Sequence, residues 1–120
     1  MEKNIIRFSY NWNGKLNNRV FTTIRLHSSK KYRAGQTFHI ELKGKVILTA
    51  TIIDKYITTL TDLTDYVCYL DTGYNKADTL GIFRRMYKNI DLTSAKFDLI
   101  LLKAVATEPQ GANDRFDKNE

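Results

Sequence analysis

The spacing of the apolar residues changes twice along this chain, and these changes limit the folds open to it. Up to Thr59 the apolar and β-branched residues recur at about every second position, which is typical of strands, because successive side chains of a strand point to opposite faces. After Thr59 they recur at helical spacing, and residues 97–105 again have the pattern of a strand. The chain is therefore predicted to form four strands, two helices and a last strand, an order typical of a small α+β barrel braced by helices.

The individual elements can be assigned from the same pattern. The first four strands are expected at Ile5–Tyr10, Val20–Leu26, Thr37–Leu42 and Val46–Ile57. Lys43-Gly44-Lys45 predicts a tight hairpin between the last two of these strands. The helices are expected at residues 60–70, with Thr61 as N-cap, and at about Lys76–Tyr87.

Length and composition favour one folded domain. With 120 residues, 42% apolar, the chain can bury a single core, which we expect within residues 1–106, followed by a disordered polar tail at 107–120. Its longest apolar run, Leu99–Leu102, is too short to cross a bilayer, and no secretion signal is apparent. The single cysteine, Cys68, cannot form an internal disulfide. These features predict a cytoplasmic protein that does not enter a membrane.

The charge of the chain is unevenly distributed. The net charge is +6, but the segment from Ala106 to Glu120 holds four acids and two bases, so the rest of the chain carries +8. A small basic body favours a polyanionic partner such as RNA, because neutralising phosphates releases counterions. The alternative is that the basic surface serves solubility alone.

One strand carries the most suggestive polar pair. Thr23 and Arg25 are two residues apart in Val20–Leu26, so they share one face of that strand. A hydroxyl beside a guanidinium can receive a phosphate, a carboxylate or a base edge. The basic loop Ser28–Arg33 follows directly. The simpler alternative is that Arg25 lies on a solvated face.

Other candidate residues each have a structural and a functional interpretation. Trp12 and Tyr74 are either packing aromatics or rings on which a base stacks. Asp78, three residues after Asn75, is a capping-box acid, a site acid or both. The two histidines lack further ligands at metal-binding spacing, so neither a metal nor a cofactor is expected.

In order along the chain, several short motifs together resemble an ASCH domain of the PUA-like superfamily. The matching segments are Asn18–Arg25 for the Gly-x-Lys-x-x-Thr-x-Arg signature, Tyr32–Phe38 for a basic loop leading into a strand, Asp71–Tyr74 with Asp78–Leu80 for an acid-bearing helix, and Phe97–Leu101 for the closing strand. The resemblance covers about Ile5 to Val105 and implies a small β-barrel of about five to six strands with two short helices. Domains of this superfamily handle RNA or modified nucleobases.

The resemblance also implies an activity. The ASCH acetylcytidine amidohydrolases hydrolyse an acetyl amide without a metal, using a Lys, a Thr and a Glu between barrel and helix. Carried over by position, the Thr is Thr23 and the acid is Asp78, but the Lys falls on Val20. Valine cannot move a proton, so Lys15 is the nearest substitute. Arg19 stays protonated and is a poor base.

Three functions remain open. The leading hypothesis is a binding module for RNA or a modified nucleoside, with Thr23, Arg25 and Asp78 in one cleft. Phosphates would then contact the other predicted ligand-binding residues, Arg19, Lys30, Lys31 and Arg33, while Tyr74 would stack on a base. The second is an amidohydrolase acting on acetylated cytidine or a similar amide through Lys15, Thr23 and Asp78. The third is an accessory protein with a vestigial cleft and a protein partner.

Overall fold

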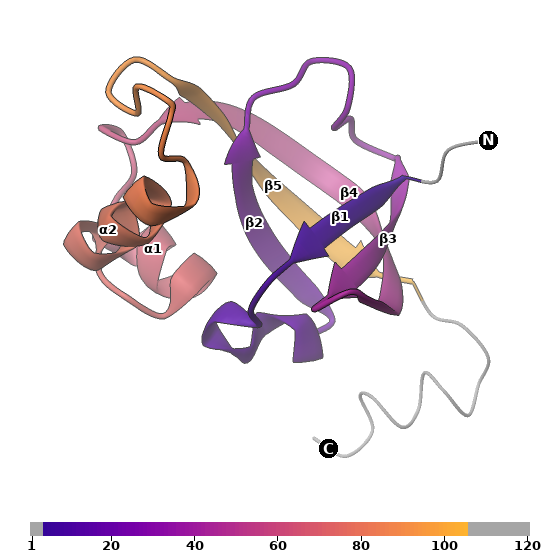
Figure 1. The fold of residues 1–120 in the computed structure, drawn as a ribbon. Coiled ribbons are helices and arrows are strands. Elements are labelled where there is room, and N and C mark those ends of the chain that lie inside the picture. Colours follow the sequence, from indigo (N-terminus) through magenta and orange to yellow (C-terminus); the bar gives the residue numbers. More distant parts are fainter. Residues whose placement is uncertain (1–3, 106–120) are drawn as a thin grey trace.

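Residues 4–105 are described by this computed structural model, and five strands among them form one sheet (Figure 1). The strands are β1 (Ile5–Phe8), β2 (Val20–Leu26), β3 (Thr37–Leu42), β4 (Lys45–Thr59) and β5 (Lys96–Ala104). Every strand end lies within two residues of the predicted position. The predicted tail, residues 107–120, lies outside the described residues.

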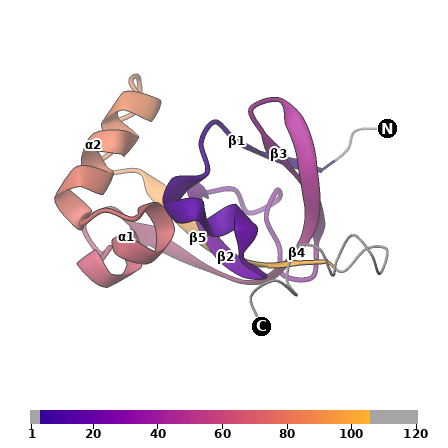
Figure 2. The same cartoon turned by 90° about the horizontal axis from the view of Figure 1, so that it is seen from below.

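The sheet curls into a half-barrel whose strand order is β1-β3-β4-β5-β2 (Figure 2). β4 is long enough to pair with β3 through its first half and with β5 through its second half. The register of the β4–β5 ladder shifts between Ile52 and Asp54, and such a bulge bends and twists a strand. β1 pairs only with β3, and β2 only with β5, so these two strands are the edges of the sheet. The α+β architecture and the curled sheet are therefore as predicted.

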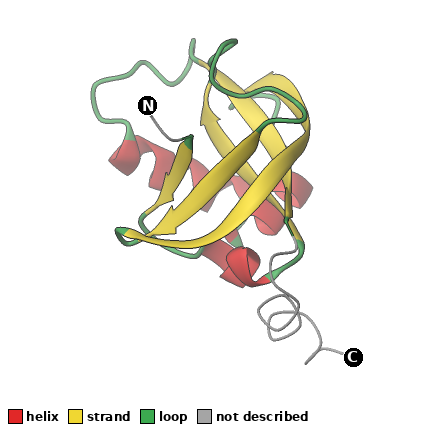
Figure 3. Cartoon of the chain, turned by 90° about the vertical axis from the view of Figure 1, so that its right-hand side faces the viewer, coloured by secondary structure: helices red, strands yellow, loops and turns green. Residues whose placement is uncertain are grey.

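The helices α1 (Asp65–Thr72) and α2 (Lys76–Met86) lie on one side of the sheet, behind the strands in Figure 3. Thr64 caps α1 by accepting a hydrogen bond from the amide of Val67, at 3.2 Å. The prediction of Thr61 as the cap was wrong, because the buried Leu60 and Leu63 continue the helical spacing through a turn that precedes the helix. No helix of the described part of the chain is long and apolar enough to span a membrane.

In two short segments of the described residues, two consecutive residues have left-handed backbone. In the predicted hairpin between β3 and β4, Lys43 and Gly44 have φ angles of 53° and 84°, the combination that a two-residue type I′ turn requires. In the 3₁₀ segment η1 (Trp12–Asn17), Asn13 and Gly14 have φ angles of 59° and 62°. This kink folds η1 back against α1, as Figure 2 shows.

Two cores meet at β2. One fills the curled sheet and includes Phe21, and the other lies between the sheet and the helices and includes Ile24. Because residues two apart share a face, Thr23 and Arg25 lie on the same face as Phe21. The candidate site residues on β2 therefore face the mouth of the half-barrel.

Candidate functional site

A small pocket opens between the two edge strands, beside the helices. Its volume is about 40 Å³, and Phe8 of β1, Thr23 and Arg25 of β2, Lys15 of η1 and Asp71 of α1 all contribute to its wall. A cavity needs a volume of roughly 10–15 Å³ to hold one water molecule, so this pocket has room for a few atoms rather than for a whole base. It suits an acetyl group, a carboxylate or the edge of a larger ligand.

The Arg25 guanidinium is held in place by two groups of the pocket wall. Its Nε donates a hydrogen bond to Thr23 Oγ1 at 2.9 Å, and its central carbon lies 4.5 Å from the centroid of the Phe8 ring. Burial lowers the pKa of Arg25, although Tyr32 and Tyr87 oppose that fall electrostatically. An arginine nevertheless stays charged at ordinary pH.

Arg25 has no ionic partner among the described residues: the ion pairs within residues 4–105 all involve other cations. Its two terminal nitrogens likewise form no hydrogen bond with this part of the protein. No buried side-chain nitrogen or oxygen of the described residues lacks a hydrogen-bond partner, so these two nitrogens reach solvent in the pocket. A guanidinium offers a planar fork of N–H donors that fits a carboxylate or a phosphate. The unpaired fork therefore marks the pocket as a place for an anion or a polar acceptor.

Lys15 and Asp71 form a buried ion pair in the same wall. The Lys15 Nζ lies 2.9 Å from Asp71 Oδ1, and the two side chains are 4% and 5% exposed. Thr22 Oγ1 donates to the same carboxylate oxygen at 2.8 Å. Burial lowers the pKa of Lys15, Asp71 opposes this effect, and the charge of Arg25 adds to it. An amine with a lowered pKa inside a pocket is typical of a functional site.

The kink in η1 positions Lys15. Asn13 Nδ2 donates to the carbonyls of Tyr69 and Leu70, each at 3.2 Å, and so holds η1 on the last turn of α1. Asn11 Oδ1 accepts a hydrogen bond from the amide of Leu16 at 2.8 Å. Lys15, between these anchors, extends into the space between η1, α1 and β2.

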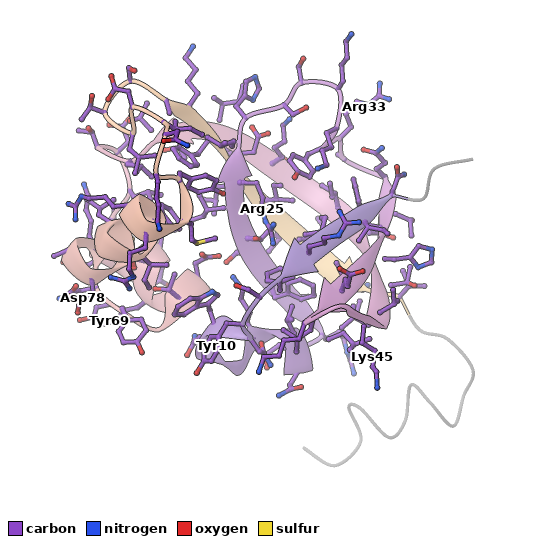
Figure 4. All side chains as sticks on the ribbon, viewed as in Figure 1. Tyr10, Arg25, Arg33, Lys45, Tyr69 and Asp78 are labelled. Carbon is purple, nitrogen blue, oxygen red and sulfur yellow. The ribbon has the colours of Figure 1, made fainter. Side chains whose placement is uncertain are left out.

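The structure brings Lys15, Thr23 and Arg25 together, but it does not bring Asp78 to them. Asp78 is exposed in the first turn of α2, where its amide donates to Asn75 Oδ1 at 2.9 Å. Figure 4 shows Asp78 at the outer edge of the helices, whereas Arg25 lies between β2 and β1. The reason is helical geometry: Asp78 follows the cap on the solvent side, and the next residue, Thr79, is buried.

Asp71 is the site residue that the sequence analysis missed. From the sequence, it is assigned only to the segment Asp71–Tyr74, which resembles part of the acid-bearing helix of ASCH domains. A signal was present, because Asp71 lies four residues after Val67 and eight after Leu63, on the apolar face of the helix. A carboxylate at a position that continues an apolar face needs a buried partner.

The basic loop lies above the pocket in the view of Figure 4, where Arg33 is labelled. Lys30, Lys31 and Arg33 are exposed, and Tyr32 between them is buried with its ring 5.9 Å from that of Phe38. Tyr32 thus anchors the loop to the core while the three cations project outward. Arg19, just before β2, is exposed and does not line the pocket.

A buried carboxylate secures the start of this loop. Asp98 is fully buried and accepts hydrogen bonds from His27 Nδ1 at 2.8 Å, from the Ser28 amide at 2.9 Å and from Lys55 Nζ at 3.3 Å. These contacts join β2, β4 and β5 where the loop begins.

The described residues contain no group of three or more His, Cys, Asp or Glu side chains able to hold a metal ion.

Tyr74 lines a different hollow from the Arg25 pocket. This second hollow, which we call the outer groove, has a volume of about 410 Å³ and lies between Trp12, Tyr74 and the face of α2 that carries Asp78 and Arg85. Trp12 also lines the Arg25 pocket, so the two hollows are neighbours.

Neither the models of known protein families nor the curated proteins compared with this chain match it. Its function is therefore inferred from the geometry of the described residues.

Proposed function

We propose that this protein binds RNA or a modified nucleoside, and that Arg25 holds a polar group of the ligand in the pocket between β1 and β2. The observation that carries the proposal is the partly buried guanidinium, oriented by Thr23 and Phe8, without an ionic partner among residues 4–105. Its planar fork matches a phosphate, a carboxylate or two neighbouring acceptors on a base.

The surroundings favour a nucleic-acid ligand over other anions. The chain is basic, with a net charge of +6, and three exposed cations, Lys30, Lys31 and Arg33, lie on the loop anchored by Tyr32. Exposed lysines and arginines hold phosphates without reading sequence, while a group in the pocket would provide selectivity. The resemblance of the sequence to ASCH domains supports the same ligand class.

The direct test is to measure the affinity of Arg25 variants for short single-stranded RNA and for acetylated cytidine. Arg25→Ala should abolish binding while the free energy of unfolding changes by no more than about 2 kcal/mol, since Arg25 lies outside the two cores. Arg25→Lys should also bind at least about tenfold more weakly, because an ammonium cannot replace the planar fork. Arg84→Lys, an exposed position on α2, is the matched control. Parental affinity of Arg25→Lys would refute the proposal.

A second candidate function, amide hydrolysis, is favoured by one observation: the buried Lys15–Asp71 pair lines the same pocket as Thr23. In this scheme the neutral amine of Lys15 accepts the proton of the Thr23 hydroxyl as its oxygen attacks the acyl carbon. Arg25 stabilises the negative charge on the carbonyl oxygen, and the leaving amine takes the proton. Water then releases the acyl group from Thr23. The acid beside the amine is Asp71 rather than Asp78.

Turnover of acetylated cytidine, followed by mass spectrometry, tests this second function. Asp71→Asn should lower the rate by at least about 100-fold because it removes the carboxylate that positions the Lys15 Nζ, 2.9 Å away. Asp62→Asn, at an exposed position, should have the parental rate. The active form of Lys15 is the deprotonated one. The rate should therefore rise with pH, with a midpoint below the usual pKa of 10.5. A parent that binds the nucleoside but never cleaves it is a binding protein only.

A further inference from the structure

We infer that the outer groove binds a nucleobase next to the group held by Arg25, an inference that rests on the proposed function. The Arg25 pocket, at about 40 Å³, is too small for a base, whereas the outer groove, at about 410 Å³, is in the usual range for ligand sites. Trp12 and Ile82 line both hollows, so one ligand can reach both.

The aromatic wall of the outer groove is held in position before any ligand binds. The Trp12 ring contacts Tyr10 at a centroid distance of 4.7 Å and Tyr74 at 6.3 Å, with interplanar angles of 61° and 74°. Both are edge contacts, so neither neighbour stacks in parallel on Trp12. Stacking a base on an indole that is already ordered requires little loss of side-chain entropy.

The opposite wall has little side-chain bulk. Ala77 and Gly81 are four residues apart on α2 and therefore share a face of the helix. A Cβ added to Gly81 would have only Arg85 Nη1 near it, at 3.9 Å. Aromatic rings and small residues thus line the same groove, which leaves room for a flat ring.

Two charged groups of the outer groove determine which base it favours. Asp78 and Arg85 line the groove, and neither side chain forms an ion pair or a hydrogen bond with another described residue. A carboxylate accepts N–H donors, and guanine offers two adjacent donors on its Watson–Crick edge, while uracil offers one between two carbonyls. Arg85 suits a phosphate of the same ligand. We therefore expect guanine to be preferred over uracil.

Trp12 is the only tryptophan of the chain and lines both hollows, so its fluorescence reports binding in either one, and the Gly81→Leu variant shows which part of the signal comes from the groove. The probes are GMP, UMP and the dinucleotides GpC and UpC. The guanine probes should quench Trp12 and bind at least about fivefold more tightly than the uracil probes. If GMP quenches Trp12, the base in the groove belongs to the nucleotide that Arg25 holds. If GpC quenches Trp12 and GMP does not, the base in the groove belongs to the neighbouring nucleotide. If no guanine probe quenches Trp12, the inference is overturned.

Gly81→Leu places a bulky side chain in the groove, at a position that does not line the Arg25 pocket. A Cβ at this position would meet only Arg85 Nη1, at 3.9 Å, and thermal unfolding checks that the variant folds. It should lose the quenching and weaken guanine binding by about tenfold or more. Asp78→Asn should remove the preference for guanine. If Gly81→Leu keeps parental affinity while Arg25→Ala loses it, the groove inference is wrong and the proposed function stands. If Arg25→Ala keeps parental affinity while Gly81→Leu loses it, the groove is a binding site and the Arg25 pocket is not.

Discussion

At the scale of single residues, the pairing of Lys15 with Asp71 places two opposite charges almost entirely inside the protein. Both charges are taken out of water, and their attraction must offset that desolvation. A hydrophobic pair of similar size would be an equally stable or a more stable solution. The charges are therefore better explained by the pocket that they line than by stability.

Removing one charge of this pair should be far more harmful than removing both. Lys15→Met should lower the free energy of unfolding by about 3–5 kcal/mol, because it leaves Asp71 buried without a counter-charge. The double variant Lys15→Met/Asp71→Leu should recover most of that loss. Urea unfolding of the parent, both single variants and the double variant measures the coupling. A double variant as unstable as Lys15→Met would mean that the bond from Thr22 to Asp71, and not the charge, stabilises this region.

At the scale of elements, the contact between η1 and α1 decides where Lys15 and Trp12 lie. Gly73 ends α1 with a φ angle of 88°, and a Cβ there would approach Asn13 Oδ1 to 3.3 Å. Asn13 is the residue that bonds the carbonyls of Tyr69 and Leu70. The end of one helix and the position of a site residue are thus coupled through one asparagine.

Gly73→Ala should therefore affect both stability and binding. We expect a loss of about 1–2 kcal/mol in the free energy of unfolding from the left-handed backbone, and weaker binding of acetylated cytidine as Asn13 and η1 shift. Gly81→Ala is the matched control for stability. Because Gly81 lies inside α2 with open space around it, alanine there should raise stability by up to about 1 kcal/mol. Equal stabilities of the two variants would contradict this account of Gly73.

At the scale of the whole molecule, the position of the site follows from the incomplete closure of the sheet. If β1 and β2 paired with each other and closed the sheet, their backbone hydrogen bonds would lie where the pocket now opens. The loop carrying Lys30, Lys31 and Arg33 leaves from the end of β2, so the same edge strand carries both the pocket residues and the start of the basic loop.

The salt dependence of RNA binding should reveal which cations touch phosphates. Replacing Lys30, Lys31 and Arg33 together by Gln should reduce the slope of log K against log salt by about 2, since each phosphate contact with single-stranded RNA contributes about 0.7. The control triple variant, Lys43, Lys45 and Lys103 to Gln, changes the net charge equally. Lys45 lies at the opposite end of the half-barrel from Arg33 in Figure 4. An equal effect of the two triple variants would mean that only net charge matters.

The strands and part of the site follow from the amino-acid sequence alone, because their signals are local. Alternation in twos predicted all five strands to within two residues, and Lys43-Gly44 predicted its hairpin. The two-residue period was also enough to put Thr23 and Arg25 on one face of β2. The cap of α1 was misassigned, since buried residues in a turn can continue a helical spacing by chance.

The choice of which acid pairs with which base depends on long-range packing. Asp78 and Asp71 are both acids near helix ends, and although the apolar spacing marks Asp71 as a buried position, no local pattern shows that Lys15 is its partner. The pairing of Lys15 with Asp71 joins residues 56 apart and depends on a kink in η1 that docks on α1. The gap between β1 and β2 likewise depends on how far the whole sheet curls. Such long-range contacts are set by the packing of several elements at once, so no local period encodes them.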